Sequence, residues 1–130
     1  MKKIITSAVI PCLLFIGGCE KDTTLIIKDV PVIISKTVSF SGDIVPIFSQ
    51  SCSLSGCHGA GGHVPNLVAD NAYVSLISGN FIDITTPENS KLYQILTGKL
   101  TPVMPMGVPN NPSNINGLVL AWIKQGAKKN

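Results

Sequence analysis

Residues 51–59 of the chain read Ser51-Cys52-Ser53-Leu54-Ser55-Gly56-Cys57-His58-Gly59. Four residues separate the two thiols in this stretch, and the histidine directly follows the second thiol. Covalent attachment of haem uses this combination, because each thiol adds to one vinyl group and the adjacent imidazole then lies over the iron. The common form of the signature has only two residues between the cysteines. Here the small residues Ser53, Ser55 and Gly56 allow the longer spacer to bulge without crowding a porphyrin.

Two other interpretations of these residues remain open. A disulfide between Cys52 and Cys57 suits an exported protein, although it leaves His58 without a role. Together with His63, the same residues also supply four candidate zinc ligands. Structural zinc sites favour closer cysteine pairs and separated histidines, so adjacent Cys57 and His58 fit such a site poorly. We therefore favour haem attachment, and we expect His63 to be a loop residue because it lies too near His58 to cross a porphyrin.

From residue 41 onward, apolar residues recur with the spacing of amphipathic helices. We expect four helices: over about 44–51, between residues 70 and 79, between residues 86 and 98, and over about 113–125. The last helix has the clearest apolar stripe, formed by Ile115, Leu118, Val119, Trp122 and Ile123. The loops between the helices are rich in glycine and proline and are long for a compact domain. We expect them to enclose a large apolar ligand that completes the core.

Polar residues mark where these helices are expected to begin. Ser41 or Asp43 is expected to cap the first helix, and Asp70 or Asn71 the second. Thr86, followed by a proline and an acidic residue, predicts the start of the third helix, which runs on to residue 98. Glycines follow the second, third and fourth helices and are expected to end them.

The first nineteen residues have the pattern of an export signal. Two lysines follow Met1, and a mostly apolar run extends from Ile4 to Ile16. This run is shorter than the roughly 20 residues that a transmembrane helix needs. The end of the segment, Ile16-Gly17-Gly18-Cys19, resembles a bacterial lipobox. That resemblance implies a lipoprotein signal peptide over residues 1–18 and lipidation of Cys19; an ordinary signal peptide or an uncleaved anchor is the alternative.

Removal of this signal would leave residues 19–130 as the mature chain. Cys12 would leave with the signal and Cys19 would carry lipid, so only Cys52 and Cys57 would remain for other chemistry. Residues 19–38 are expected to form a lipid-anchored linker, either as a tether or as a strand pair that turns at residues 28–31, and the domain follows over residues 39–130. Several acyl chains hold a protein stably on a membrane. We therefore expect the protein in the bacterial cell envelope, facing the periplasm or the exterior.

The charge of the chain excludes one class of partner. All ten basic residues are lysines, and with seven acidic residues they give a net charge of +3. A nucleic-acid-binding domain needs a clustered basic face, and the lysines here are scattered along the chain. We therefore expect no nucleic-acid partner.

The chain resembles monohaem class I cytochrome c, in particular the planctomycete-type cytochrome c domain, whose attachment motif has the longer spacer. Its opening is similar to Asp43-Ile44-Val45-Pro46-Ile47-Phe48, followed by Cys52 and then by Gly56-Cys57-His58-Gly59. Its final helix is similar to Ala121-Trp122-Ile123 followed by Gly126-Ala127. The resemblance covers about residues 40–130. It implies an all-α, cytochrome c-like fold of three to five helices, with long loops wrapped around one covalently bound haem c.

The resemblance also assigns roles to individual residues. Cys52 and Cys57 would form the thioether bonds, and His58 would be the proximal iron ligand. Met104 would be the distal ligand; the family has Met-Pro-Pro at this place, whereas Met106 follows Pro105 here and competes for the role. We favour Met104 because prolines on both sides stiffen its approach. The carbonyl oxygen of Pro65 is expected to orient the proximal imidazole.

The function implied by the resemblance is one-electron transfer, not enzymatic catalysis. Ligation by methionine and histidine fills both axial positions and raises the reduction potential. The expected partners are redox proteins of a respiratory or oxidative chain, together with the membrane that the lipid anchor reaches. If neither methionine binds iron, the alternative is a haem-based peroxidase-like enzyme or a gas sensor with a labile distal ligand. A non-haem interaction domain held by a Cys52–Cys57 disulfide is the third interpretation.

Overall fold

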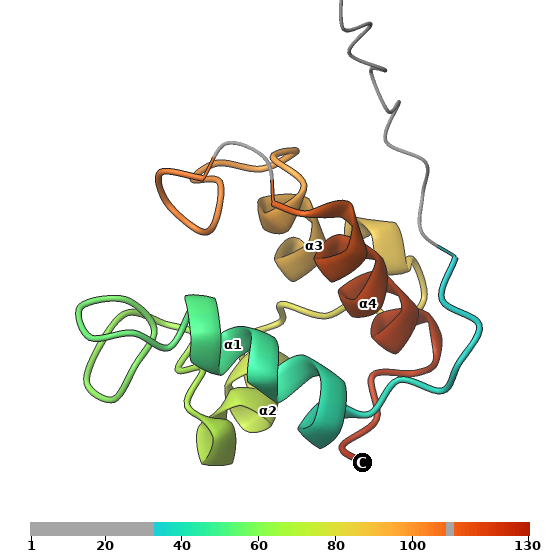
Figure 1. Cartoon of the computed structure of the whole chain (residues 1–130), viewed down its shortest axis with the longest axis horizontal. Helices are drawn as coiled ribbons and strands as arrows, with labels where there is room; N and C mark the ends of the chain where they lie inside the picture. Colours follow the sequence, from blue (N-terminus) through green and yellow to red (C-terminus); the bar gives the residue numbers. More distant parts are fainter. Residues whose placement is uncertain (1–32, 109–110) are drawn as a thin grey trace, which may run out of the picture.

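The structure, a computed structural model, describes residues 33–108 and 111–130 (Figure 1). This part of the chain is helical and contains no strand, which confirms the all-α prediction. Its elements are η1 (Phe40–Ile44), α1 (Val45–Ser51), α2 (Ala69–Ser78), η2 (Pro87–Asn89), α3 (Lys91–Leu96) and α4 (Ser113–Lys124). The signal peptide, Cys19 and most of the linker lie outside the described residues.

The helices form two pairs that share one core. Helix α1 packs on α2, and α4 packs on α3 and on the short 3-10 helix η2. The single π-helical turn η1 leads directly into α1 and also contacts α4, so it joins the two pairs (Figure 1). The long loops 52–68 and 97–108 therefore leave the helical body from different pairs, one from the end of α1 and the other from the end of α3.

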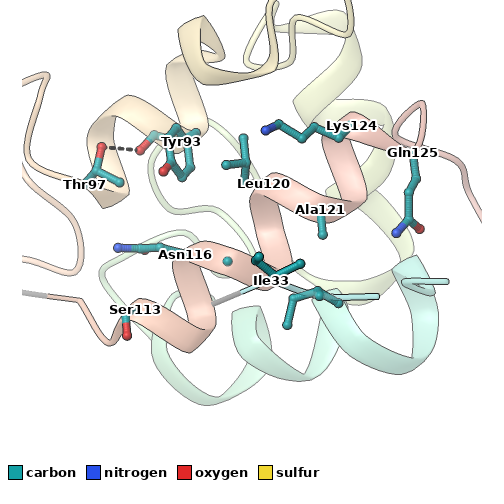
Figure 2. Close-up of a pocket in the computed structure, with 11 residues that line it drawn as sticks. Ile33, Tyr93, Thr97, Ser113, Asn116, Leu120, Ala121, Lys124 and Gln125 are labelled. Carbon is teal, nitrogen blue, oxygen red and sulfur yellow. Dashed lines mark hydrogen bonds between the residues drawn. The ribbon is translucent and has the colours of Figure 1, made fainter. Parts of the chain in front are cut away.

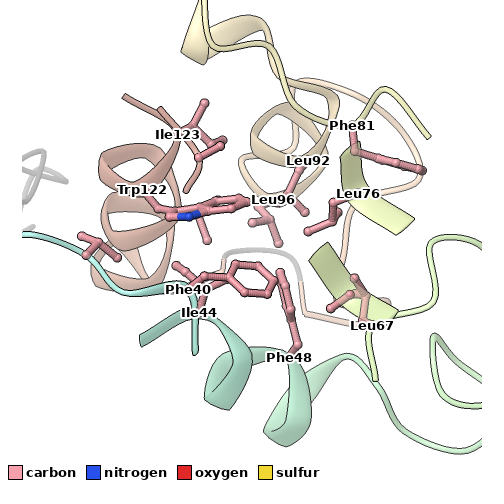
Figure 3. Packing of buried hydrophobic residues seen from close by; sticks show 14 residues of the cluster. Phe40, Ile44, Phe48, Leu67, Leu76, Phe81, Leu92, Leu96, Trp122 and Ile123 are labelled. Atoms are coloured by element: carbon pink, nitrogen blue, oxygen red, sulfur yellow. The ribbon is translucent and has the colours of Figure 1, made fainter. Parts of the chain in front are cut away.

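Aromatic side chains lie at the centre of the core (Figure 3). The Phe40 ring lies 5.1 Å from Trp122, 5.3 Å from Tyr73 and 6.4 Å from Phe48, measured between ring centroids. The Trp122 side chain is only 1% exposed, and its indole N–H donates to the Lys128 carbonyl oxygen at 2.9 Å. The other buried apolar residues come from η1, α2, α3, α4 and the segments that join or flank them: Val38, Ile44, Leu67, Ala72, Leu76, Phe81, Leu92, Leu96, Val119, Ile123 and Ala127.

The start of the first helical segment is hydrogen-bonded to Asn130, the last residue described. The Asn130 carbonyl oxygen accepts from the Ser41 N–H at 2.9 Å, and its side-chain oxygen accepts from the Phe40 N–H at 2.8 Å. Just before this contact, the Gln125 side chain accepts from the Val38 N–H at 2.8 Å and donates to the Lys36 carbonyl oxygen at 3.0 Å. These bonds hold the segment before η1 against the end of α4.

The caps of the first two helices differ from those predicted. Ser39, not Ser41 or Asp43, caps the first helical segment, because its hydroxyl accepts from the Gly42 N–H at 3.1 Å. Asp43 instead accepts from the Ser39 N–H at 2.9 Å, so its side chain caps the backbone of the residue that caps the helix. Val68 precedes α2 in place of Asp70 or Asn71, and Asp70 lies in the first turn, where an acidic side chain is also favourable.

The third helix is broken where the sequence predicted it to continue. Residues 87–89 form η2, α3 begins only at Lys91, and the backbone of Ser90 between them is extended. The Ser90 hydroxyl accepts from the Asp83 N–H at 2.8 Å and donates to the Asp83 carbonyl oxygen at 3.2 Å. A serine that bonds a distant backbone segment competes with helical geometry, and this explains the break.

Helix α4 begins at Ser113 and ends at Lys124, as the sequence predicted to within one residue. Gly126 adopts a positive φ of 92°, a conformation that glycine reaches without strain, and so ends the helix at the expected place. The burial of the apolar stripe of α4 changes along the helix. Its later residues are buried, whereas Ile115 and Leu118, in the half nearest the 97–108 loop, remain half-buried.

Candidate functional site

The candidate site starts where α1 ends. Cys52 follows the last residue of α1, and its N–H donates to the Phe48 carbonyl oxygen at 2.8 Å. The chain then turns through the loop 52–68, which carries Cys57 and His58. This loop and the 97–108 loop extend to the same side of the helical body, on the left in Figure 1. The predicted site residues therefore gather on two loops at one end of the domain.

Backbone hydrogen bonds fix the shape of the first loop. The His58 N–H donates to the Cys52 carbonyl oxygen at 3.1 Å, and the His63 N–H donates to that of Cys57 at 2.7 Å. The Leu67 N–H donates to the His58 carbonyl oxygen at 2.8 Å and closes the loop on itself. Gly62 has no room for a side chain, since a Cβ atom there would lie 2.2 Å from the Cys57 carbonyl oxygen. The thiols and the histidine are thus held in one compact turn.

The imidazole of His58 is oriented through one of its two nitrogens. Its Nδ1 lies 3.0 Å from the Pro65 carbonyl oxygen and 3.1 Å from the His63 carbonyl oxygen. Carbonyl oxygens only accept, so in the neutral imidazole Nδ1 carries the proton and Nε2 keeps a free lone pair. This is the arrangement of a metal-ligating histidine, whose second nitrogen donates to a backbone carbonyl. The Pro65 contact was expected, whereas nothing in the sequence pointed to the His63 carbonyl.

The two thiols have different surroundings. Cys52 is half-buried against the core cluster, whereas Cys57 is exposed on the loop. Burial, and then the nearby charge of Cys57, raises the pKa of the Cys52 thiol to about 11. Both thiols are free, and no disulfide joins them. Cys52 is therefore a neutral thiol at physiological pH, with its sulfur at the edge of the apolar core.

The two methionines of the second loop also differ. Met104 is half-buried, and its N–H donates to the Ile95 carbonyl oxygen in α3 at 3.3 Å. Met106 is 75% exposed. Among the described residues, no hydrogen bond links this loop to the loop that carries His58. The structure therefore places His58 and Pro65 together with both thiols, and it leaves Met104 on the facing loop.

The two loops expose apolar side chains and almost no charge. Residues 44–69 and residues 100–123 contain no aspartate, glutamate, lysine or arginine. The side chains of Val64 and Met106 are 77% and 75% exposed. Leu54 and Val108 on the same loops, and the half-buried stripe of α4, add further apolar surface. A large apolar group held between the loops would cover surface that the protein itself leaves in water, so these residues fit a haem.

The geometry speaks against the zinc interpretation. Within residues 33–108 and 111–130, no three histidine, cysteine, aspartate or glutamate side chains gather closely enough to hold a metal ion together. His63 turns its carbonyl toward His58, and the residue is exposed. A tetrahedral site needs four convergent ligands. A haem iron needs only two axial ligands from the protein, and the nitrogen of His58 and the sulfur of Met104 are suited to that role.

A separate groove touches the second loop only at its first residue, Thr97. It has a volume of about 460 Å³ and runs between α3, α4 and the start of the described chain, with Ile33, Tyr93 and Leu120 on its walls (Figure 2). Cys52, Cys57, His58, Pro65 and Met104 are not among its lining residues. The groove therefore contributes nothing to the candidate site.

Comparisons of the chain with protein families, with curated proteins and with solved structures found no match. The functional argument therefore depends on the residues and contacts described above. None of the helices in the described residues is both long enough and apolar enough to cross a membrane.

Proposed function

We propose that this protein carries one covalently attached haem c and transfers single electrons. The observation that carries the proposal is the hydrogen bond from His58 Nδ1 to the Pro65 carbonyl oxygen, made within the loop that bears both thiols. It leaves Nε2 free on the side chain that directly follows the second thiol. A disulfide or a loop histidine has no need for this orientation.

Each of the candidate residues would have its own role in binding the haem. Cys52 and Cys57 would fix the haem through thioether bonds, and His58 would supply the proximal nitrogen. Met104 would supply the distal sulfur, since its half-buried position and its bond to α3 restrain it more than the exposed Met106. When bound, the haem supplies an iron that gains and loses one electron. With both axial positions filled, substrates have no open position on the metal.

The surroundings favour fast electron exchange. The exposed Leu54 and Val64 and the half-buried stripe of α4 would pack on the porphyrin and exclude water from it. A site that excludes water reorganises little when the charge of the iron changes, and it raises the reduction potential. The second loop carries Lys99 as its one charged side chain among its described residues, so we propose weak electrostatic steering toward redox partners. We propose that a lipid anchor on Cys19 instead confines the domain to a membrane of the cell envelope.

The test is to make the full chain in a host with cytochrome c maturation and to record the pyridine haemochrome spectrum. A haem with two saturated vinyl groups is expected, together with a low-spin Fe(III) spectrum and a sulfur-to-iron charge-transfer band in the near infrared. His58→Ala should abolish the low-spin species, whereas His63→Ala, the matched control in the same loop, should keep it. A colourless protein would refute the proposal. A covalently bound haem with a high-spin Fe(III) spectrum in the unaltered protein would support the peroxidase-like enzyme or gas sensor instead.

A further inference from the structure

We propose that the backbone carbonyl of His63 is a second hydrogen-bond acceptor for the proximal imidazole and that it lowers the reduction potential of the haem. This inference rests on the proposed function, because it concerns the same ligand. His63 acts here through its carbonyl oxygen and not through its side chain, so it is a positioning residue.

The two carbonyl oxygens lie at similar distances from the imidazole nitrogen. His58 Nδ1 lies 3.0 Å from the Pro65 oxygen and 3.1 Å from the His63 oxygen, both within ordinary hydrogen-bonding distance. The backbone of His63 is itself held in place, because its N–H donates to the Cys57 carbonyl oxygen at 2.7 Å. The second acceptor is therefore part of the hydrogen-bonded loop.

Gly62 makes this arrangement possible. A Cβ atom at position 62 would lie 2.2 Å from the Cys57 carbonyl oxygen, so any other residue would force the backbone beside His63 to move. Gly61 differs from it: a Cβ atom there would meet no atom within 4 Å, although its φ of 72° is left-handed. The close approach at Gly62 thus allows the His63 carbonyl oxygen to lie 3.1 Å from His58 Nδ1.

The chemical consequence follows from how acceptors act on a ligating imidazole. An oxygen that accepts a hydrogen bond from Nδ1–H increases the electron density of the ring, and this makes Nε2 a stronger electron donor to iron. A stronger donor stabilises Fe(III) more than Fe(II), and the reduction potential falls. Two acceptors therefore hold the potential lower than Pro65 alone would. This opposes the upward effect of the methionine ligand and of haem burial.

The direct test weakens this one acceptor without changing any side chain. Replacing Val64 by its α-hydroxy acid converts the His63–Val64 amide into an ester, and an ester carbonyl is a weaker acceptor than an amide carbonyl. The exchange also removes the Val64 N–H, which donates no hydrogen bond among the described residues. We expect the haem content and the low-spin spectrum to stay the same and the reduction potential to rise.

The matched control is the same exchange at Gly61, which turns the Ala60 carbonyl into an ester. Neither the Ala60 carbonyl nor the Gly61 N–H takes part in a hydrogen bond in the described structure, so the potential should stay constant. An unchanged potential in the Val64 ester, or an equal rise in both esters, would overturn the inference while leaving the proposed function intact. Absence of covalent haem from the unaltered protein would instead overturn the proposed function.

Single substitutions provide a second test that needs no ester. Gly62→Ala should displace the His63 carbonyl and raise the potential, while Gly61→Asn should leave it unchanged, because asparagine tolerates left-handed backbone. Equal potentials in the two variants would contradict the inference. If Gly62→Ala fails to assemble, the two esters decide the question.

Discussion

Replacing Ser90 with alanine should destabilise the domain through one buried hydroxyl. The side chain of Ser90 is 1% exposed, and its oxygen bonds both the N–H and the carbonyl oxygen of Asp83. Alanine would remove both bonds and leave the Asp83 backbone groups without these partners in a partly buried turn. An unsatisfied group of this kind costs about 1–3 kcal/mol. We therefore expect the free energy of unfolding to fall by about 2 kcal/mol.

The matched control for this prediction is Ser78→Ala. The Ser78 hydroxyl also bonds a backbone oxygen, that of Val74 at 2.7 Å, but it is exposed and water can replace it. Its loss should change the free energy of unfolding by no more than about 0.5 kcal/mol.

Urea unfolding of the purified protein, followed by far-ultraviolet circular dichroism, measures both effects. With a slope of about 1–2 kcal/mol per molar urea, Ser90→Ala should lower the midpoint by about 1–2 M without changing the slope. Equal midpoints for Ser90→Ala and Ser78→Ala would refute the reasoning, because the buried hydroxyl would then contribute no more than an exposed one.

Three further predictions concern the site and the anchor. Met104→Ala should give a high-spin haem and remove the near-infrared charge-transfer band, whereas Met106→Ala should keep both features; the reverse result would reassign the ligand. Cys19→Ala should release the protein from membranes in cell fractionation, and persistent anchoring would contradict lipidation. In protein made without haem, iodoacetamide should modify Cys52 far more slowly than Cys57 at pH 8, by peptide mass spectrometry. Because burial raises the pKa of Cys52 to about 11, its rate should keep increasing up to that pH; equal rates at pH 8 would show that burial does not protect it.

The helices that follow from local pattern were predictable from the sequence, and those that depend on distant contacts were not. Helix α4 was predictable because its apolar stripe and Gly126 lie within the helix and directly after it. The break at Ser90 was not, because a bond to Asp83, seven residues earlier, decides it. The cap at Ser39 was missed because Ser41 and Asp43 lie nearer to the expected start of the helix and have side chains that can also cap it.

The candidate site divides in the same way. Cys52, Cys57 and His58 lie within seven consecutive residues, so their chemistry could be predicted from their spacing. The acceptor role of His63 could not, since every residue has a carbonyl group and its direction depends on the folded loop. The glycine at position 62 is the one local hint, because close backbone approaches favour glycine.

Hydrogen bonds that link Asn130 to η1 and to Ser39, just before it, bring the last described residue against the start of the first helical segment. Because the Ser41 N–H lies 2.9 Å from the Asn130 backbone oxygen, a short peptide would suffice to join Asn130 to a chain that began just before η1. Both loops of the candidate site extend from the side of the helical body opposite Asn130 (Figure 1). Such a joined protein, or one fused at this place to another protein or to a solid support, would keep the candidate site open to solution.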